Sequence, residues 1–179
     1  MYKRQVINSD AKLSLVLRLL GRLEEAQKYA TSAVALSMKS FGSDHPFTLM
    51  SKAELSAVFV AQHQDKEALQ LLSEITALSR KAFIGAKNYR TAMVLSLVGQ
   101  ANLELGQFTL AESNLMEANE ILTNAPPPSP RNLRECLRSL VKLYTNWNKI
   151  EPNAKYAAQA AQWQAKLDAL GKPQSSTTL

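Results

Sequence analysis

Three observations predict that this chain is an all-α protein made of stacked helical hairpins. A turn pattern recurs at residues 20–26, 63–68 and 105–111, and it places alanines at 26, 68 and 111, spacings of 42 and 43 residues. Apolar residues follow a period of about 3.6 along the chain, without a convincing alternating strand. The length of 179 residues fits about four such units. A fixed period of this size is typical of a solenoid, in which each hairpin closes its core on the next.

The helical pattern divides into four pairs, whose first members are called A helices and whose second members are called B helices. The expected pairs are 6–20 with 23–40, 46–62 with 65–84, 89–105 with 107–123, and 131–147 with 153–170. Boundary signals agree with this division. Residues 43–45 offer caps before Pro46, and Ser129 precedes Pro130 in the same way. Gly42 and Gly85 follow the first and second B helices, where a left-handed residue is favoured.

Three segments fall outside the expected repeats, which occupy residues 6–124 and 131–170. Residues 125–130 are rich in proline and predict a stiff linker, which between two helices is favoured over a recognition motif for a proline-binding module. Residues 171–179 have almost nothing to bury and predict a disordered tail. Residues 1–5 match a translation of GTG-TAT-AAG-AGA-CAG, the end of a transposon adapter. We therefore expect a sequencing-adapter artefact there, with a short basic N-terminus as the alternative.

The net charge of +6 is unevenly distributed. Between Arg90 and Arg131 there is no Lys or Arg, whereas four glutamates occur there: Glu104, Glu112, Glu117 and Glu120. A basic cluster follows, made of Arg131, Arg134, Arg138 and Lys142. Two interpretations remain open, namely complementary charge between stacked neighbours and a basic patch for an acidic partner.

No sequence motif indicates catalysis, so we expect no catalytic residue, cofactor or metal site. A glycine-rich phosphate loop, an H-E-x-x-H motif and a cysteine cluster are all absent from the sequence. His45 and His63 lack a ligand partner at helical spacing. Cys136 has cationic neighbours in Arg134 and Arg138, which would lower its pKa, but no histidine base lies nearby, so we favour a buried small residue. No apolar run is long enough to cross a bilayer and no signal peptide is visible, which favours a cytoplasmic location.

The segment Gly42-Ser43-Asp44-His45-Pro46-Phe47-Thr48 resembles the inter-repeat signature of tetratricopeptide repeats of the kinesin-light-chain-like kind. The resemblance extends over residues 6–170, with departures: His63 stands where that family has glycine, and Asp65 where it has an aromatic residue. It implies a right-handed superhelix of about four repeats whose A helices line a concave groove. Residues 151–159 resemble an insertion against that pattern, which would lengthen the last helix or its loop.

The third and fourth repeats resemble the closing repeats of arrays in some environmental bacteria, which often form the C-terminal part of serine/threonine protein kinases. The resemblance implies a protein-interaction scaffold that binds a protein or peptide, and an acidic partner is one of the two open interpretations of the basic cluster. The alternative is a recruitment region of a kinase whose catalytic domain lies upstream. Nucleic-acid binding through the basic helix is a remote alternative, and neither nucleic acid nor membrane is expected. The candidate groove residues are Arg18, Met50, Ala57, Met93, Gln100, Arg134, Arg138 and Lys142.

Overall fold

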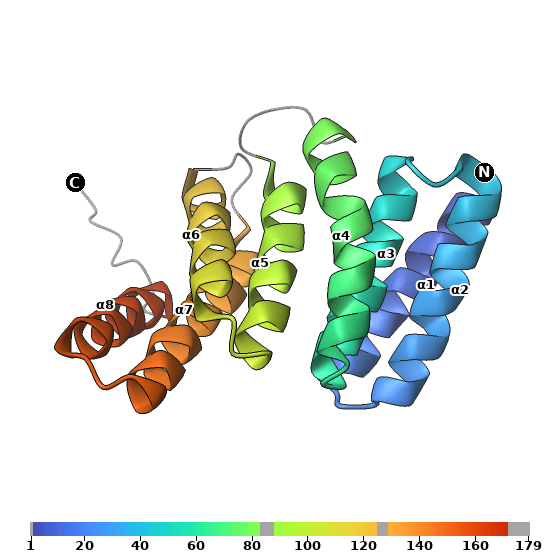
Figure 1. Ribbon diagram of the computed structural model, residues 1–179. Coiled ribbons are helices and arrows are strands. Elements are labelled where there is room, and N and C mark those ends of the chain that lie inside the picture. The colour runs from blue at the N-terminus through green and yellow to red at the C-terminus, as the bar shows by residue number, and fades with distance from the viewer. Residues whose placement is uncertain (1, 83–87, 125–128, 172–179) are drawn as a thin grey trace.

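The computed structural model describes residues 2–82, 88–124 and 129–171, and over these residues the chain forms eight α-helices and no strand (Figure 1). The A helices are α1 (Tyr2–Leu19), α3 (Pro46–Ala61), α5 (Tyr89–Glu104) and α7 (Pro130–Ile150). The B helices are α2 (Leu23–Phe41), α4 (Asp65–Ala82), α6 (Phe108–Asn124) and α8 (Ala154–Gly171). The predicted boundaries are confirmed to within two residues, except at the start of α1 and the end of α7.

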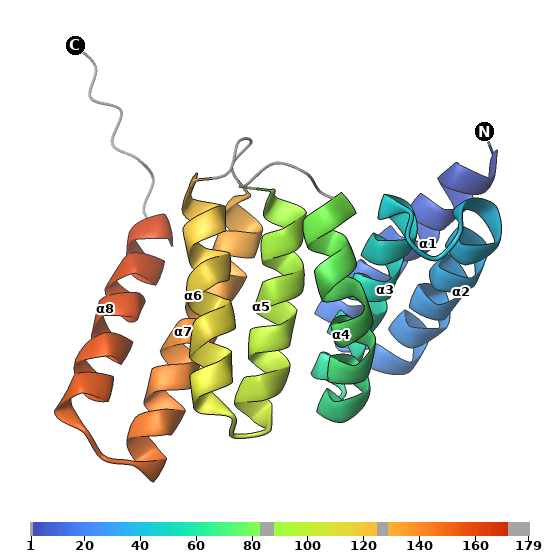
Figure 2. The same ribbon diagram turned by 45° about the horizontal axis from the view of Figure 1, so that its top comes forward.

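The helices stack in chain order as a solenoid. Each helix packs against the next one along the chain. Neighbouring A helices also contact each other. Figures 1 and 2 show the pairs following one another, with α1 and α8 at opposite ends. The chain is therefore an all-α helical-repeat solenoid, as the period of the sequence predicted.

Small residues set how closely the helices approach. The three recurring alanines, Ala26, Ala68 and Ala111, are completely buried because each lies where a B helix meets the A helices beside it. Gly99 of α5 allows the closest approach. A Cβ atom at this position would lie 2.5 Å from Leu115 Cγ of α6 and 3.3 Å from the carbonyl oxygen of Ala111.

The turns inside the first three repeats share one backbone geometry. Gly21, His63 and Gly106 have positive φ angles of 75°, 58° and 72°. In each turn the following amide donates to a carbonyl five residues back, as Gln107 N does to Asn102 O at 2.9 Å. This is the closure of a Schellman-type helix end. His63 therefore takes a glycine's backbone conformation, although a side chain is disfavoured there.

The caps between repeats confirm some of the expected signals and correct one. Gly42 has a φ of 89°, as expected after a B helix, and its carbonyl accepts from Thr48 Oγ1 at 2.7 Å. The capping side chain of α3 is His45, whose Nδ1 accepts from Phe47 N at 3.2 Å. Ser43 does not cap the helix, because its hydroxyl donates to Asp44 Oδ1 at 2.6 Å.

Other expected signals are confirmed in part or lie outside the described residues. Pro130 begins α7 as predicted, but the side chain of Ser129 makes no capping hydrogen bond. Gly85, residues 125–128 of the expected linker and residues 172–179 of the expected tail are not among the described residues.

The fourth repeat is lengthened in its A helix. Helix α7 has 21 residues, whereas α3 and α5 have 16 each. A three-residue turn follows, in which Asn153 N donates to Asn148 Oδ1 at 2.9 Å and Asn153 Oδ1 accepts from Lys155 N at 2.9 Å. Residues 151–159 fall in this turn and the start of α8, and α8 with 18 residues is no longer than α2 or α4, so the extra length lies in α7 and not, as the sequence predicted, in the last helix or its loop.

Both tryptophans pack the last repeat. The Trp147 ring stacks on Tyr156 of α8 and on Phe108 of α6, at centroid distances of 4.5 and 5.5 Å. Trp163 is buried in the same apolar cluster. This aromatic stack ties α7 to the helices on both sides of it.

Candidate binding groove

Two adjoining hollows lie along the A helices and form one groove. The charged hollow, of about 280 Å³, is lined by α1, α3, α5 and α7. The apolar hollow, of about 560 Å³, lies toward the beginnings of the same helices. The two share Glu54, Met93, Arg131 and Asn132 as lining residues, so a ligand segment can pass from one into the other.

The apolar hollow offers an adaptable hydrophobic surface. Ile7 and Leu15 of α1, Met50 of α3, and Tyr89 and Met93 of α5 line it. Methionine side chains are flexible and polarisable, so they accommodate apolar groups of different shapes. Met50 and Met93 line this hollow and are partly exposed.

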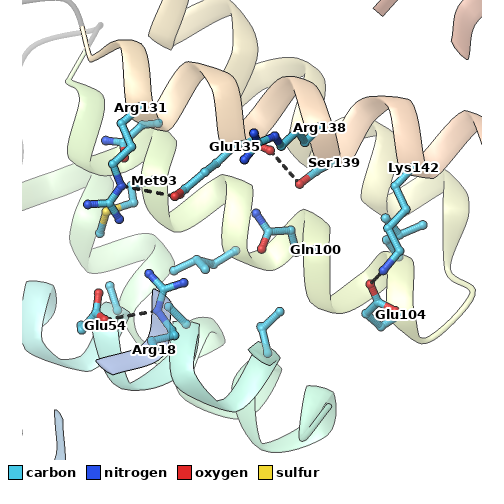
Figure 3. Close-up of a pocket in the computed structure, with 16 residues that line it drawn as sticks. Arg18, Glu54, Met93, Gln100, Glu104, Arg131, Glu135, Arg138, Ser139 and Lys142 are labelled. Atoms are coloured by element: carbon cyan, nitrogen blue, oxygen red, sulfur yellow. Dashed lines mark hydrogen bonds and ion pairs between the residues drawn. The ribbon is translucent and has the colours of Figure 1, made fainter. Parts of the chain in front are cut away.

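The charged hollow contains three cation–carboxylate pairs (Figure 3). Arg18 Nε of α1 lies 3.3 Å from Glu54 Oε1 of α3, and Arg131 Nε of α7 lies 3.3 Å from Glu135 Oε1. Lys142 of α7 pairs with Glu104 of α5. The first and third pairs join different repeats, so they cross-link the walls of the groove.

Arg138 differs from the other cations of the hollow. It lines the charged hollow from α7, and its side chain is exposed. It has no hydrogen bond or ion pair with the described residues, whereas Arg18, Arg131 and Lys142 each have a carboxylate partner. Arg138 is thus the cation of the charged hollow that can bind a carboxylate from outside the chain.

Glu54 occupies the point where the two hollows meet. Burial raises the pKa of its carboxyl group above the usual range, and the nearby carboxylate of Glu135 adds to this. The cationic side chains of Arg18 and Arg131 act in the opposite direction. Burial outweighs the two cations, one from α1 and one from α7, so the charged form of Glu54 is disfavoured overall.

The structure places most of the predicted groove residues together. Six of them line the charged hollow, and these are Arg18, Ala57, Met93, Gln100, Arg138 and Lys142. Met50 lines the apolar hollow. Arg134 lines neither hollow, because its guanidinium points to α8 and donates to the carbonyl oxygen of Leu170 at 3.5 Å. The basic residues of α7 therefore do not share a single face.

Sequence reasoning missed the carboxylates of the groove. Glu54 lies four residues after Met50, which places it on the same face of the helix, so its spacing contained the signal. Glu135 lies four residues after Arg131 on the same helix, so its spacing contained a signal too, whereas the pairing of Glu104 with Lys142 depends on how the repeats stack.

Both interpretations of the uneven charge find support in different residues. Two of the four glutamates of the third repeat meet the fourth, because Glu104 pairs with Lys142 and Glu112 Oε1 accepts from Tyr144 Oη at 2.5 Å, whereas Glu117 pairs with Arg80 of the second repeat. Complementary charge therefore joins these stacked neighbours. Arg138, one turn before Lys142, is left for the second interpretation, a basic contact for an acidic partner.

Cys136 is a buried core residue. It is completely buried, and its thiol donates to the carbonyl oxygen of Leu115 at 3.4 Å. Burial raises the pKa of the thiol to about 11, opposite to the effect its basic neighbours in sequence would have.

The described residues include no group of three or more His, Cys, Asp or Glu side chains placed to hold a metal ion. Of the helices described, none combines the length and apolar character that crossing a membrane requires.

Comparison with known proteins identifies the repeats. Residues 5–81 match the family model of the tetratricopeptide repeat. The structure is similar to a putative kinesin light chain of Podosopora anserina with nearly identical TPR-like repeats, with a TM-score of 0.64 and 19% identity over 96% of this chain and 92% of that one. It is also similar to BtubC (BKLC) from P. vanneervenii, with a TM-score of 0.70 and 16% identity over 97% of this chain and 69% of that one.

A single-substitution variant of the Podosopora anserina protein gives a TM-score of 0.62 and 19% identity over 92% of this chain and 89% of that one. No protein of curated function matches the sequence. Residues 5–81 thus consist of tetratricopeptide repeats, and the described chain has the fold of kinesin-light-chain-like repeat proteins. This repeat fold is generally a non-catalytic scaffold.

Proposed function

We propose that this chain is a protein-interaction scaffold whose groove holds a segment of a partner protein, and that the segment contains an acidic residue next to an apolar one. The observation that carries the proposal is Arg138, an exposed arginine without a carboxylate partner among the described residues, in a hollow whose other cations are paired. An arginine guanidinium binds a carboxylate through two parallel hydrogen bonds, so this position selects for Asp, Glu or a chain terminus.

The apolar hollow supports the second half of the proposal. Burial of an apolar side chain against Met50 and Met93 supplies affinity, and the charged contact at Arg138 supplies selection. Because the hollows adjoin at Glu54, an extended or helical segment can use both at once.

The balance of charge argues for an acidic protein segment over nucleic acid. Four cations line the charged hollow, and three carboxylates lie among them. A surface that binds a phosphate backbone gains its affinity from many unbalanced cations, so this hollow is poorly suited to that task. The groove therefore favours a local contact with one or two carboxylates.

A charge-reversal series on α7 tests the proposal. We expect Arg138→Glu to weaken binding of an acidic peptide, selected on the wild-type protein, by about tenfold or more and to flatten its salt dependence. Lys142→Glu should weaken binding less, since its cation is already balanced by Glu104. Fluorescence anisotropy titrations at two salt concentrations measure both effects.

The matched control is Arg134→Glu, which changes the net charge equally from the same helix but faces α8. Equal losses in Arg134→Glu and Arg138→Glu would show a long-range charge effect and contradict a contact in the groove. Unchanged helicity by circular dichroism excludes misfolding as the cause.

A further inference from the structure

Glu54 is a carboxylate placed among the cations of the groove. It lines both hollows from α3, at the point where they adjoin. Figure 3 shows Glu54 and Arg18 on one wall of the charged hollow, with Arg131 and Arg138 on α7 opposite them. Glu54 Oε1 lies 3.3 Å from Arg18 Nε, and only 14% of the Glu54 side chain is exposed. Water therefore screens this carboxylate poorly, so its charge strongly affects the cations around it.

Arg18 keeps hydrogen-bonding groups that Glu54 does not use. Only its Nε donates to Glu54, and its two Nη groups have no hydrogen bond with the described residues. In Figure 3 the Arg18 guanidinium points from α1 toward α7. Because Arg18 lines the charged hollow, these Nη groups are available to an acidic ligand. The charge of Arg18 is offset by Glu54 as long as that carboxylate is ionised, so an acidic ligand competes with Glu54 for this cation.

The charged groups that act on Glu54 come from two neighbouring helices. Arg18 belongs to α1, and Arg131 and Glu135 belong to α7. The other charged residues that line the two hollows are Lys12, Arg90, Glu104, Arg138 and Lys142. Among the described residues, no member of α2 or α4 and no histidine lines either hollow. Glu54 is therefore the group of the groove best placed to change its charge in mildly acidic solution.

Protonation of Glu54 changes the charge of the groove without removing a side chain. Burial raises the pKa of its carboxyl group above the ordinary value of 4.5, while Arg18 and Arg131 lower it and Glu135 raises it further. As the pH falls, Glu54 therefore takes up its proton before the exposed carboxylates of an acidic peptide take up theirs. Arg18 then becomes an uncompensated cation, and the net charge of the hollow rises by one.

We propose that Glu54 competes with the partner's acidic group for the cations of the groove, and that its protonation makes the groove bind acidic segments more tightly. This inference rests on the proposed function, because it concerns the regulation of the same groove. Linkage adds a second consequence. A bound carboxylate favours the protonated form of Glu54, so binding takes up a proton. A fall in pH therefore strengthens binding, and a rise in pH favours release.

Fluorescence anisotropy titrations at two pH values test this proposal, with the acidic peptide selected on the wild-type protein as the probe. We expect the affinity of the wild type to rise by about threefold or more from a pH of about 7.5 to about 5.5. Glu54→Gln should bind more tightly than the wild type at the higher pH and change little at the lower, because glutamine has the shape of the protonated side chain without its charge. An equal pH dependence in both proteins, or none in the wild type, would overturn the proposal.

Glu135→Gln is the matched control, because it removes one carboxylate from the same hollow. Glu135 pairs with Arg131 of its own helix, and its side chain is 35% exposed, against 14% for Glu54. We expect Glu135→Gln to tighten binding at both pH values and to leave the pH dependence in place. A pH dependence that disappears in Glu135→Gln and persists in Glu54→Gln would overturn the assignment. Weaker binding by Glu54→Gln at the higher pH would also overturn it, since the carboxylate would then only position Arg18.

NMR of 13C-labelled glutamate carboxyl groups tests the inference on the free chain. The signal that is missing from Glu54→Gln belongs to Glu54. Its titration midpoint should lie above pH 4.5, the ordinary value, and the acidic peptide should raise it further. A midpoint at or below this value would overturn the proposal. Unchanged peptide binding by Arg138→Glu would contradict the proposed groove contact, whereas pH-independent binding that Arg138→Glu still weakens would contradict only the role of Glu54.

Discussion

Helices α5 and α7 are both A helices, yet they are held in place by different means. Ten of the 16 residues of α5 are buried, and its closest contact is the approach of Gly99 to Leu115. Only six of the 21 residues of α7 are buried. Helix α7 also contacts its neighbours through polar groups. Tyr144 Oη donates to Glu112, Cys136 Sγ donates to the carbonyl oxygen of Leu115, and Lys142 pairs with Glu104.

The difference follows from position in the stack. Helix α5 is enclosed by α3, α4, α6 and α7, so the size of its side chains decides the fit. Helix α7 is nearer the end and keeps a charged face toward the groove, so its inward polar groups need partners. The packing of an internal repeat thus depends on the volumes of its side chains. The packing of the last repeat depends on side-chain volumes and also on the pairing of polar groups. Because α7 keeps its charged face toward the groove, Arg138 can contact a ligand there.

The largest expected effect concerns the volume at Gly99. We expect Leu115→Ala to lower the free energy of unfolding by about 2–5 kcal/mol, because it empties a completely buried site. Gly99→Ala should cost about 1–3 kcal/mol by overpacking. In the double variant the new methyl group enters the space that Leu115 vacates, so the combined loss should be smaller than the sum. Urea denaturation of the wild type, the two single variants and the double variant measures the four free energies of unfolding. Strictly additive losses would show that the close approach of Gly99 to Leu115 does not limit the side-chain volume at position 99 of α5.

The second effect concerns the buried thiol of α7. Burial raises the pKa of Cys136 from 9.0 to about 11, so folding favours the protonated form. The buried protonated thiol contributes fully to the free energy of unfolding below pH 9. This contribution is lost as the pH rises to about 11, where the free energy of unfolding is lower by about 2 kcal/mol. Cys136→Ala should therefore show a flatter decline of unfolding free energy between pH 8 and about 11. Parallel curves for the two proteins would mean that the thiol is not buried in solution.

The smallest effects concern the turns that follow the two helices. The turn after α5 needs a left-handed residue at Gly106, so Gly106→Ala should cost about 1 kcal/mol. The turn after α7 depends on the side chain of Asn153, which accepts from Lys155 N, so Asn153→Ala should cost about 1 kcal/mol and Asn153→Gly only about 0.3 kcal/mol. Thermal melts compare the variants. The reverse ranking of Ala and Gly at position 153 would contradict the assignment of Asn153 as a cap.

Much of the fold and part of the groove could be predicted from the sequence. Helix boundaries follow from local periodicity, and positions such as Met50, Met93 and Gln100 follow from the repeat spacing. The ion pairs between repeats could not be predicted in this way, because Arg18 and Glu54 are 36 residues apart and Lys142 and Glu104 are 38 apart. Whether such residues meet depends on the curvature of the whole stack. Arg134 was misplaced for the same reason, since the crossing of α7 and α8 turns it away from the groove.

The methionines allow the central claim, occupation of the groove, to be tested directly. Met50 and Met93 line it, whereas Met38 of α2 and Met116 of α6 are exposed on B helices and line neither hollow. With 13C-labelled methionine methyl groups, addition of the acidic peptide should shift the NMR signals of Met50 and Met93 and leave those of Met38 and Met116 in place. Saturable binding that shifts Met38 or Met116 while Met50 and Met93 stay unchanged would contradict the account.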